Sequence, residues 1–294
     1  MILLLQAILV FALVTVALLM AGAFTIAWFS IHPLRFRNRR NPSQFGATYE
    51  NIGFSSADGT PLKGWYIPAE GARSVLILAH GMSANRSQMI PWAEWLWKAG
   101  YSILLFDFRG LGESGGDVCT MGLREPEDIL AAVDYLESKE ETSGSQVGIL
   151  GFSMGGTSAM IAAARDERIE FVVSHGAYAD LDRAIYQRCR KHFGPLAPPV
   201  DYWSRKFGQR WFPVESSEIS ALREVGKIAP RPLLLLNGAK DSIVRPRNAH
   251  DLLAAAGRGD LWILPNSGHA YPGGVDETEY RQLVLNFIKL HAGM

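Results

Sequence analysis

Gly151-Phe152-Ser153-Met154-Gly155-Gly156 is the stretch of sequence that decides the fold of this chain. It follows Val147–Leu150, an apolar run of strand length, and it opens the Ala-rich run Met154–Ala164, which has the composition of a helix. A serine in a sharp turn between a strand and a helix stands clear of the sheet edge, and small residues on both sides allow the turn. The helix N-terminus beside it favours negative charge. The pattern G-x-S-x-G in this setting predicts that Ser153 is a nucleophile.

A serine hydroxyl needs a base to take its proton, and the base needs a carboxylate to orient it. His269 and Asp241 are the candidates, because each lies in a loop directly after a predicted buried strand. They also follow Ser153 in the order serine, acid, histidine. The remaining histidines after Ser153 are interpreted as surface or core imidazoles: His175, His192, His250 and His291.

The negative charge that develops during attack on a carbonyl needs two backbone N–H donors. One is expected from Met154, the residue after the nucleophile. The other is expected from Met82, in the loop His80–Ser83 after the first buried strand. His80 itself is interpreted as a residue that shapes this loop. Asp107 and Arg109, after the second buried strand, are interpreted as a structural clasp between loops.

The rest of the chain alternates apolar runs of strand length with helical segments. Such strands are apolar on both faces, which is typical of a mostly parallel sheet flanked by helices. The expected strands are 49–54, 62–67, 75–79, 102–107, 147–151, 171–174, 233–237 and 261–264, and the expected helices include 91–99, 125–137, 154–164 and 275–291. The alternation breaks at about residues 178–228, which we interpret as a lid inserted over the C-terminal edge of the strands.

The first 31 residues carry no charged side chain, and a helix needs about 20 apolar residues to cross the hydrocarbon core. Residues 1–31 are therefore predicted to be a single-pass transmembrane anchor, residues 32–47 a basic juxtamembrane linker, and residues 48–294 the globular domain. Four arginines follow the apolar run and none precedes it, which places the domain in the cytoplasm by the positive-inside rule. A cleaved signal peptide is the alternative, with Ala21-Gly22-Ala23 as its cleavage site.

Composition narrows the classes of function. The chain has 294 residues, with 29 basic and 29 acidic side chains, so its formal net charge is zero and gives no support for a nucleic-acid partner. It has two cysteines, Cys119 and Cys189, and so small a number argues against a disulfide framework. No Cys/His cluster indicates a metal site. We expect neither a metal nor an organic cofactor.

The segments 79–82, 107–114, 151–155, 237–241 and 267–269 resemble those of the α/β-hydrolase superfamily. Within it the chain is similar to the serine-aminopeptidase-like branch, with its cinnamoyl esterases and BEM46-like proteins, over about residues 48–292. The resemblance implies an α/β-hydrolase fold, a nucleophile, acid and base at Ser153, Asp241 and His269, and oxyanion donors at Met82 and Met154. It also implies acyl transfer to water through an acyl-Ser153 intermediate.

The expected function is a membrane-anchored serine hydrolase that acts on a carboxylic ester or thioester, with a small-molecule or lipid acyl ester as substrate. Two alternatives stay open: a peptidase or amidase that uses the same three residues, and a non-catalytic scaffold on a hydrolase fold. The inserted segment mixes seven basic side chains with seven aromatic ones over residues 183–212. This composition fits a surface that rests on anionic lipid, and equally an ordinary lid over the pocket.

Overall fold

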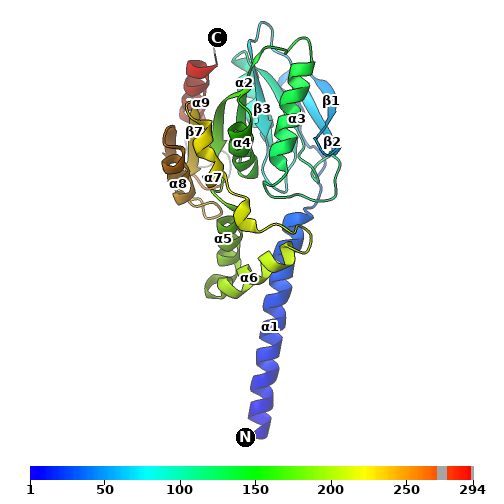
Figure 1. Ribbon diagram of the computed structural model, residues 1–294, viewed down its shortest axis with the longest axis vertical. Coiled ribbons are helices and arrows are strands. Elements are labelled where there is room, and N and C mark those ends of the chain that lie inside the picture. The colour runs from blue at the N-terminus through cyan, green and yellow to red at the C-terminus, as the bar shows by residue number, and fades with distance from the viewer. Residues whose placement is uncertain (270–276, 293–294) are drawn as a thin grey trace.

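A sheet of eight strands forms the centre of the protein, in a computed structural model that describes residues 1–269 and 277–292 (Figure 1). The strand order is β1-β2-β4-β3-β5-β6-β7-β8. The β1–β2 and β2–β4 pairs are antiparallel, and all the pairs from β4 to β8 are parallel. The strands are β1 (Glu50–Ser55), β2 (Pro61–Ile67), β3 (Ser74–Ala79), β4 (Ser102–Phe106), β5 (Gln146–Phe152), β6 (Ile169–His175), β7 (Leu233–Gly238) and β8 (Asp260–Leu264).

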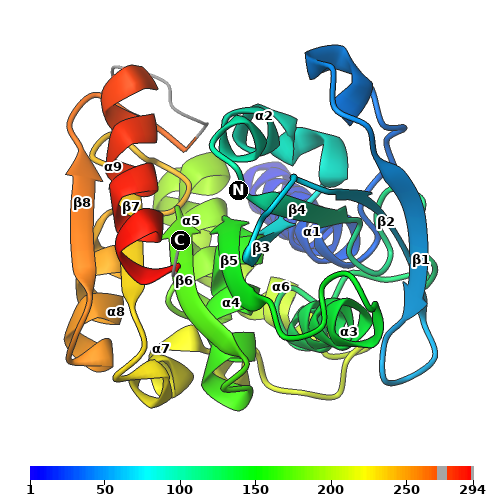
Figure 2. The same cartoon turned by 90° about the horizontal axis from the view of Figure 1, so that it is seen from above.

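Helices cover both faces of this sheet, as the view from above shows (Figure 2). One face packs against α2 (Ile90–Lys98) and α9 (Glu277–His291), which share an apolar core with the inner side chains of the strands. The other face packs against α3 (Glu125–Ser138), α4 (Met154–Arg165) and α8 (Arg247–Ala256). Apolar runs such as Leu76–Leu78 are buried on both sides for this reason.

The predicted fold class is confirmed: the sheet is mixed, mostly parallel and flanked by helices. Each expected strand has its counterpart, and the bounds differ by one or two residues, as sequence patterns generally allow. The expected C-terminal helix, 275–291, is present from Glu277 onward, and its first two residues lie outside the described part of the chain.

The segment expected to be a lid, about residues 178–228, forms three α-helices and three short 3-10 helices between β6 and β7. The α-helices are α5 (Leu181–Phe193), α6 (Ala197–Gly208) and the short α7 (Ala221–Glu224). Figure 1 shows α5 and α6 below the sheet, beside the upper part of α1 (Ile2–Ile31). Because the parallel strands end at this edge, the inserted helices lie over the loops that carry the predicted site residues.

The N-terminal apolar run forms one continuous helix, α1, which is long and apolar enough to cross a membrane. Most of it projects away from the rest of the protein (Figure 1), and Leu9 and Leu18 are 60% and 67% exposed. Its last turns are different. Ala23, Ala27 and Ile31 are buried, and the helix packs here against α6.

The last turns of α1 contact the inserted segment of the globular domain on the far side of the expected boundary at residue 31. Small side chains explain the close approach, since Ala23 joins an apolar cluster with Cys189, Ala197 and Val200 of the inserted segment. Hydrogen bonds hold the same region together: the Ser204 hydroxyl donates to the Ala23 carbonyl at 3.1 Å. The last third of α1 is part of the globular structure.

Residues 32–47, expected to be a linker, are also attached to the domain. Arg35 donates a hydrogen bond to the Ser114 carbonyl at 2.8 Å, and Asn85 donates one to the Phe36 carbonyl at 2.8 Å. A short 3-10 helix follows at Pro42–Phe45. These contacts hold the segment after α1 against the loops at the sheet edge.

Candidate active site

Ser153 lies in the sharp turn between β5 and α4. Its backbone φ is 53°, a value that residues other than glycine rarely adopt. The turn closes only because its flanking residues are small. A Cβ on Gly151 would lie 2.4 Å from the Gly155 carbonyl oxygen, and one on Gly155 would lie 2.2 Å from that of Ala79. The Ser153 amide donates to the His175 carbonyl at 2.8 Å, which ties the strained residue to the neighbouring strand. Strain held in this way is common at functional sites.

The three side chains predicted to act together form one hydrogen-bonded chain. His269 Nε2 lies 3.0 Å from Ser153 Oγ, and His269 Nδ1 lies 2.6 Å from Asp241 Oδ2. The other oxygen of Asp241 accepts hydrogen bonds at 2.8 Å from the amides of Ile243 and Val244, which fix the carboxylate. The Asp241 side chain is buried and the His269 side chain is 16% exposed, so the carboxylate that orients the imidazole is shielded from solvent.

Both expected oxyanion donors lie beside Ser153. Met154 is the first residue of α4, where an N–H has no acceptor within the helix. The loop that carries Met82 comes close to the nucleophile, since a Cβ on Gly81 would lie 3.4 Å from Ser153 Cβ. Among the hydrogen bonds of residues 1–269 and 277–292, none uses the amide of Met82 or Met154. These N–H groups are free to bind a substrate oxygen.

Buried charges hold the loops around Ser153. Asp107 accepts hydrogen bonds from the Arg86 amide and guanidinium, and so holds the loop after β3. Arg109 binds Asp128 on α3 through two nitrogens. This pair of contacts is the structural clasp expected from the sequence, and it fixes the loops without entering the cavity.

His80 has the loop-shaping environment expected of it. Its Nε2 accepts a hydrogen bond from the Phe108 amide at 3.1 Å, so the proton is on Nδ1, which lies 2.7 Å from the Gly81 carbonyl oxygen. Complete burial lowers the pKa of this imidazole and keeps it neutral.

A cavity of about 240 Å³ opens in front of Ser153. One side is formed by the loops of the sheet edge, and the other by α1 and α5. The side chains on the sheet side include Met82, Ser153, Met154 and Val244, which we call the sheet wall. Those on the opposite side include Ile26, Ser30, Ile185 and Arg188, which we call the helical wall.

The helical wall holds the residues that sequence reasoning missed. His192 was interpreted as a surface or core imidazole, but it lines the cavity beside Lys191 and Arg188. Among the described residues, the hydrogen-bond partners of the Arg188 guanidinium are neutral, Ser30 and Met82, and burial lowers its pKa. Its guanidinium lies 3.3 Å from Ser30 Oγ on α1. The basic composition of residues 183–212 was the available signal, although it could not say which cations face inward.

His175, the other histidine that follows a strand, does not contact Ser153 through its side chain. It is buried under the site, and its Nδ1 lies 3.1 Å from the Tyr280 hydroxyl. Burial, together with the nearby His269, lowers its pKa to about 4, so it stays neutral. The interpretation of His175 as a core imidazole agrees with this position. The two cysteines are both buried and free.

Comparisons with known proteins bear on the family and the fold of the chain. A model of the prolyl oligopeptidase family matches residues 88–294. The uncharacterized protein YfhR of Salmonella typhi is 27% identical over 254 residues, which cover 83% of this chain and 82% of that protein. The thiohydrolase aneE of Aspergillus aculeatus is 35% identical over 134 residues, 43% of this chain and 41% of that protein. The esterase Pf2001 of Pyrococcus furiosus superposes with a TM-score of 0.76 at 26% identity, covering 90% of this chain and 99% of that one.

Proposed function

The chain belongs to the prolyl oligopeptidase family and is a serine hydrolase with the α/β-hydrolase fold. We propose that it is a membrane-anchored esterase or thioesterase that works through an acyl-Ser153 intermediate. The observation that carries this proposal is the hydrogen-bonded chain from Ser153 through His269 to Asp241, which opens onto a largely apolar cavity. The superfamily expected from the motifs is confirmed, and the narrower branch stays a resemblance.

The proposed acyl transfer uses the groups around Ser153 in turn. His269 Nε2 takes the proton of Ser153 Oγ as the oxygen attacks the carbonyl carbon of the substrate. The amides of Met82 and Met154 bind the resulting oxyanion, and Asp241 stabilises the imidazolium. His269 then gives its proton to the departing alcohol or thiol, which leaves the acyl group on Ser153. Water, deprotonated by His269, releases the acid and restores the enzyme.

Two observations favour an ester or thioester over an amide. The cavity in front of Ser153 is lined largely by apolar side chains, with its charged groups gathered on α5. Among the similar proteins of named activity, the esterase and the thiohydrolase are 26% and 35% identical to this chain, against 18% for an acylaminoacyl peptidase of Pyrococcus horikoshii. The family also includes peptidases, as its name says, so a peptidase or amidase is the alternative.

A panel of matched substrates decides between them. Full-length protein in detergent would be given one acyl group as a p-nitrophenyl ester, a thioester and an anilide, beside the Ser153→Ala variant. We expect kcat/KM for the ester and thioester to exceed that for the anilide by at least about 100-fold, because a poor amine leaving group makes the greater demand on acid catalysis. An anilide cleaved as fast as the ester would assign a peptidase, and inert wild type would support the scaffold alternative.

We propose further that α1 is a permanent anchor and that the inserted segment lies against the same membrane. Phe24 and Trp28 on α1 contact Phe207 and Trp211, with ring centroids 5.6 Å apart for Phe24–Phe207 and 5.5 Å apart for Trp28–Trp211. Aromatic side chains gather at membrane interfaces, and basic ones attract anionic lipid. The four arginines after α1 favour a cytoplasmic domain.

The mass of the protein purified from membranes tests the anchor. An intact chain that stays in the membrane pellet at alkaline pH is the expected result. A soluble product that has lost the residues up to Ala23 would instead establish a cleaved signal peptide. Protease treatment of intact cells then tests the orientation, since a cytoplasmic domain is protected.

A further inference from the structure

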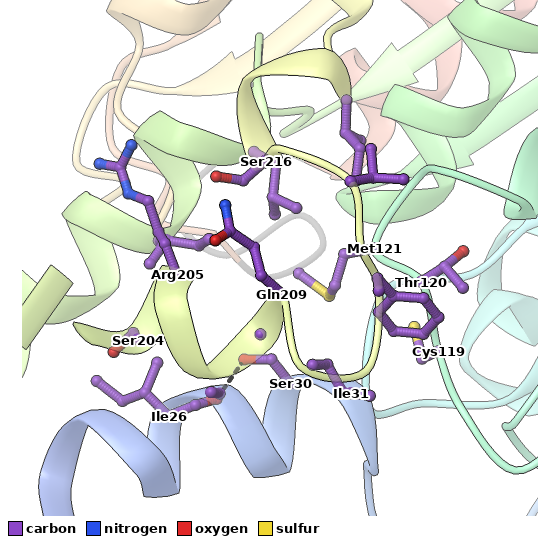
Figure 3. A pocket seen from close by; sticks show the side chains of 17 residues that line it. Ile26, Ser30, Ile31, Cys119, Thr120, Met121, Ser204, Arg205, Gln209 and Ser216 are labelled. Carbon is purple, nitrogen blue, oxygen red and sulfur yellow. Dashed lines mark hydrogen bonds between the residues drawn. The ribbon is translucent and has the colours of Figure 1, made fainter. Parts of the chain in front are cut away.

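A second cavity, of about 80 Å³, adjoins the one in front of Ser153. Figure 3 shows the side chains that line the second cavity. It lies between the last turns of α1, the end of α6 and the loop that carries Cys119 and Met121. The two cavities have four lining residues in common: Ile26, Ser30, Met121 and Ile185. These side chains therefore border both spaces, and the two cavities are neighbours along α1.

The second cavity suits an apolar ligand. Its hydroxyl groups are already hydrogen-bonded, Ser30 to the Ile26 carbonyl at 2.6 Å and Ser204 to the Ala23 carbonyl at 3.1 Å. The guanidinium of Arg205 is paired with Asp201 and Asp182. The remaining lining is mostly aliphatic or aromatic and includes Ala27, Ile31, Leu181, Phe212, Val214 and Ile219.

We propose that the second cavity holds the far end of a long acyl chain whose carbonyl group lies at Ser153, so that α1 helps to select the substrate by chain length. This inference rests on the proposed function and assigns to α1 a role beyond anchoring. Each methylene buried in such a cavity contributes about a four-fold gain in kcat/KM, if the chain stays there in the transition state. An ester too short to reach α1 gains nothing from this cavity.

The position of the cavity along α1 also indicates where such a substrate comes from. The hydrocarbon core takes about 20 residues of helix, which is the length of α1 before Ala23 becomes buried. Ile26 and Ser30 then lie just beyond the core, next to the aromatic contacts of Trp28 with Trp211. An acyl chain held there is at the level of the lipid headgroups, so the substrate class is a long-chain acyl ester or thioester from the bilayer.

Two substitutions fill the second cavity without touching the catalytic groups. Ala27 lines the second cavity and not the first, so Ala27→Phe blocks it from α1. Gly208→Leu blocks it from α6, where a new Cβ would meet nothing closer than Ile31 Cδ1 at 3.9 Å. The matched control is Ala21→Phe, on the exposed side of α1.

The measurement is kcat/KM for p-nitrophenyl esters of butyrate and dodecanoate, with the full-length protein in liposomes. We expect Ala27→Phe and Gly208→Leu to lower the dodecanoate value by about 10- to 100-fold, because about two to three methylenes lose their site. The butyrate value should stay within about two-fold, and Ala21→Phe should change neither. Equal effects at both chain lengths, or none, would overturn the inference. Serine-dependent butyrate hydrolysis would then still support the proposed function.

A labelling experiment on the wild type avoids the risk that a variant misfolds. A dodecyl fluorophosphonate with a diazirine at the chain end would react with Ser153, and light would then attach the chain end to its neighbours. Cross-links to residues 26–31 of α1 or 204–214 of α6 and the turn after it are expected. Cross-links confined to other segments would contradict the inference, and failure to label Ser153 at all would count against the proposed function instead.

Discussion

The two walls of the cavity are built in different ways. The sheet wall, with Ser153 and Met154, is set by backbone geometry: a positive φ, glycines with no room for a Cβ, and amide donors at a helix start. The helical wall, with Ile26 and Arg188, is set by side-chain packing between α1 and the inserted helices. The comparison teaches that the chemistry is local to a few turns, whereas the shape of the substrate depends on segments far apart in the sequence.

The largest effect is expected from damage to the sheet wall, where every substrate meets the same base. His269→Ala should lower kcat by about 10⁴-fold or more for short and long esters alike, because Ser153 loses the group that takes its proton. Steady-state rates at both chain lengths check this. His250→Ala, on the exposed side of α8, is the control and should leave kcat unchanged. A loss of kcat restricted to long esters would contradict the assignment of the chemistry to the sheet wall.

The turn itself is expected to tolerate no added atom. Gly155→Ala places a Cβ where the Ala79 carbonyl oxygen is 2.2 Å away, so the backbone of the turn must shift. We expect it to lower the free energy of unfolding by about 2 kcal/mol or more, and activity with it. Gly53→Ala in β1 is the control, since its Cβ would have ordinary contacts from 3.5 Å. Comparable melting temperatures for the two variants would show that the turn is not tightly constrained.

The sheet wall and the helical wall also differ in how far the sequence could predict them. Ser153, Asp241 and His269 were found because each lies at a strand end with a local pattern, and the order of strands then brings the ends together. The role of α1 could not be found in this way. An all-apolar helix shows no preferred face, so nothing in residues 1–31 indicates that Ala23 and Ala27 pack on α6. Such long-range packing becomes visible only in the structure.

The smallest expected effect is a pH dependence of stability caused by His175, which is buried beneath the sheet wall. His175 has a folded pKa of about 4, below its ordinary 6.5, so the unfolded chain takes up a proton there first as the pH falls. The contribution of neutral His175 to the free energy of unfolding is therefore fully present above pH 6.5, and it is lost as the pH falls toward 4. The apparent melting temperature should drop by about 3 °C per pH unit in this window. His175→Asn should flatten that dependence, and an unchanged slope would assign it to other groups.

The central claim is that Ser153 is an activated nucleophile at a cavity shared by the sheet and α1. Labelling of the purified full-length protein with a fluorophosphonate probe, beside Ser153→Ala, tests it most directly. The account predicts rapid labelling of the wild type in detergent or liposomes, and none in the variant. A folded wild type that stays unlabelled in both settings, or a variant that labels equally, would contradict it.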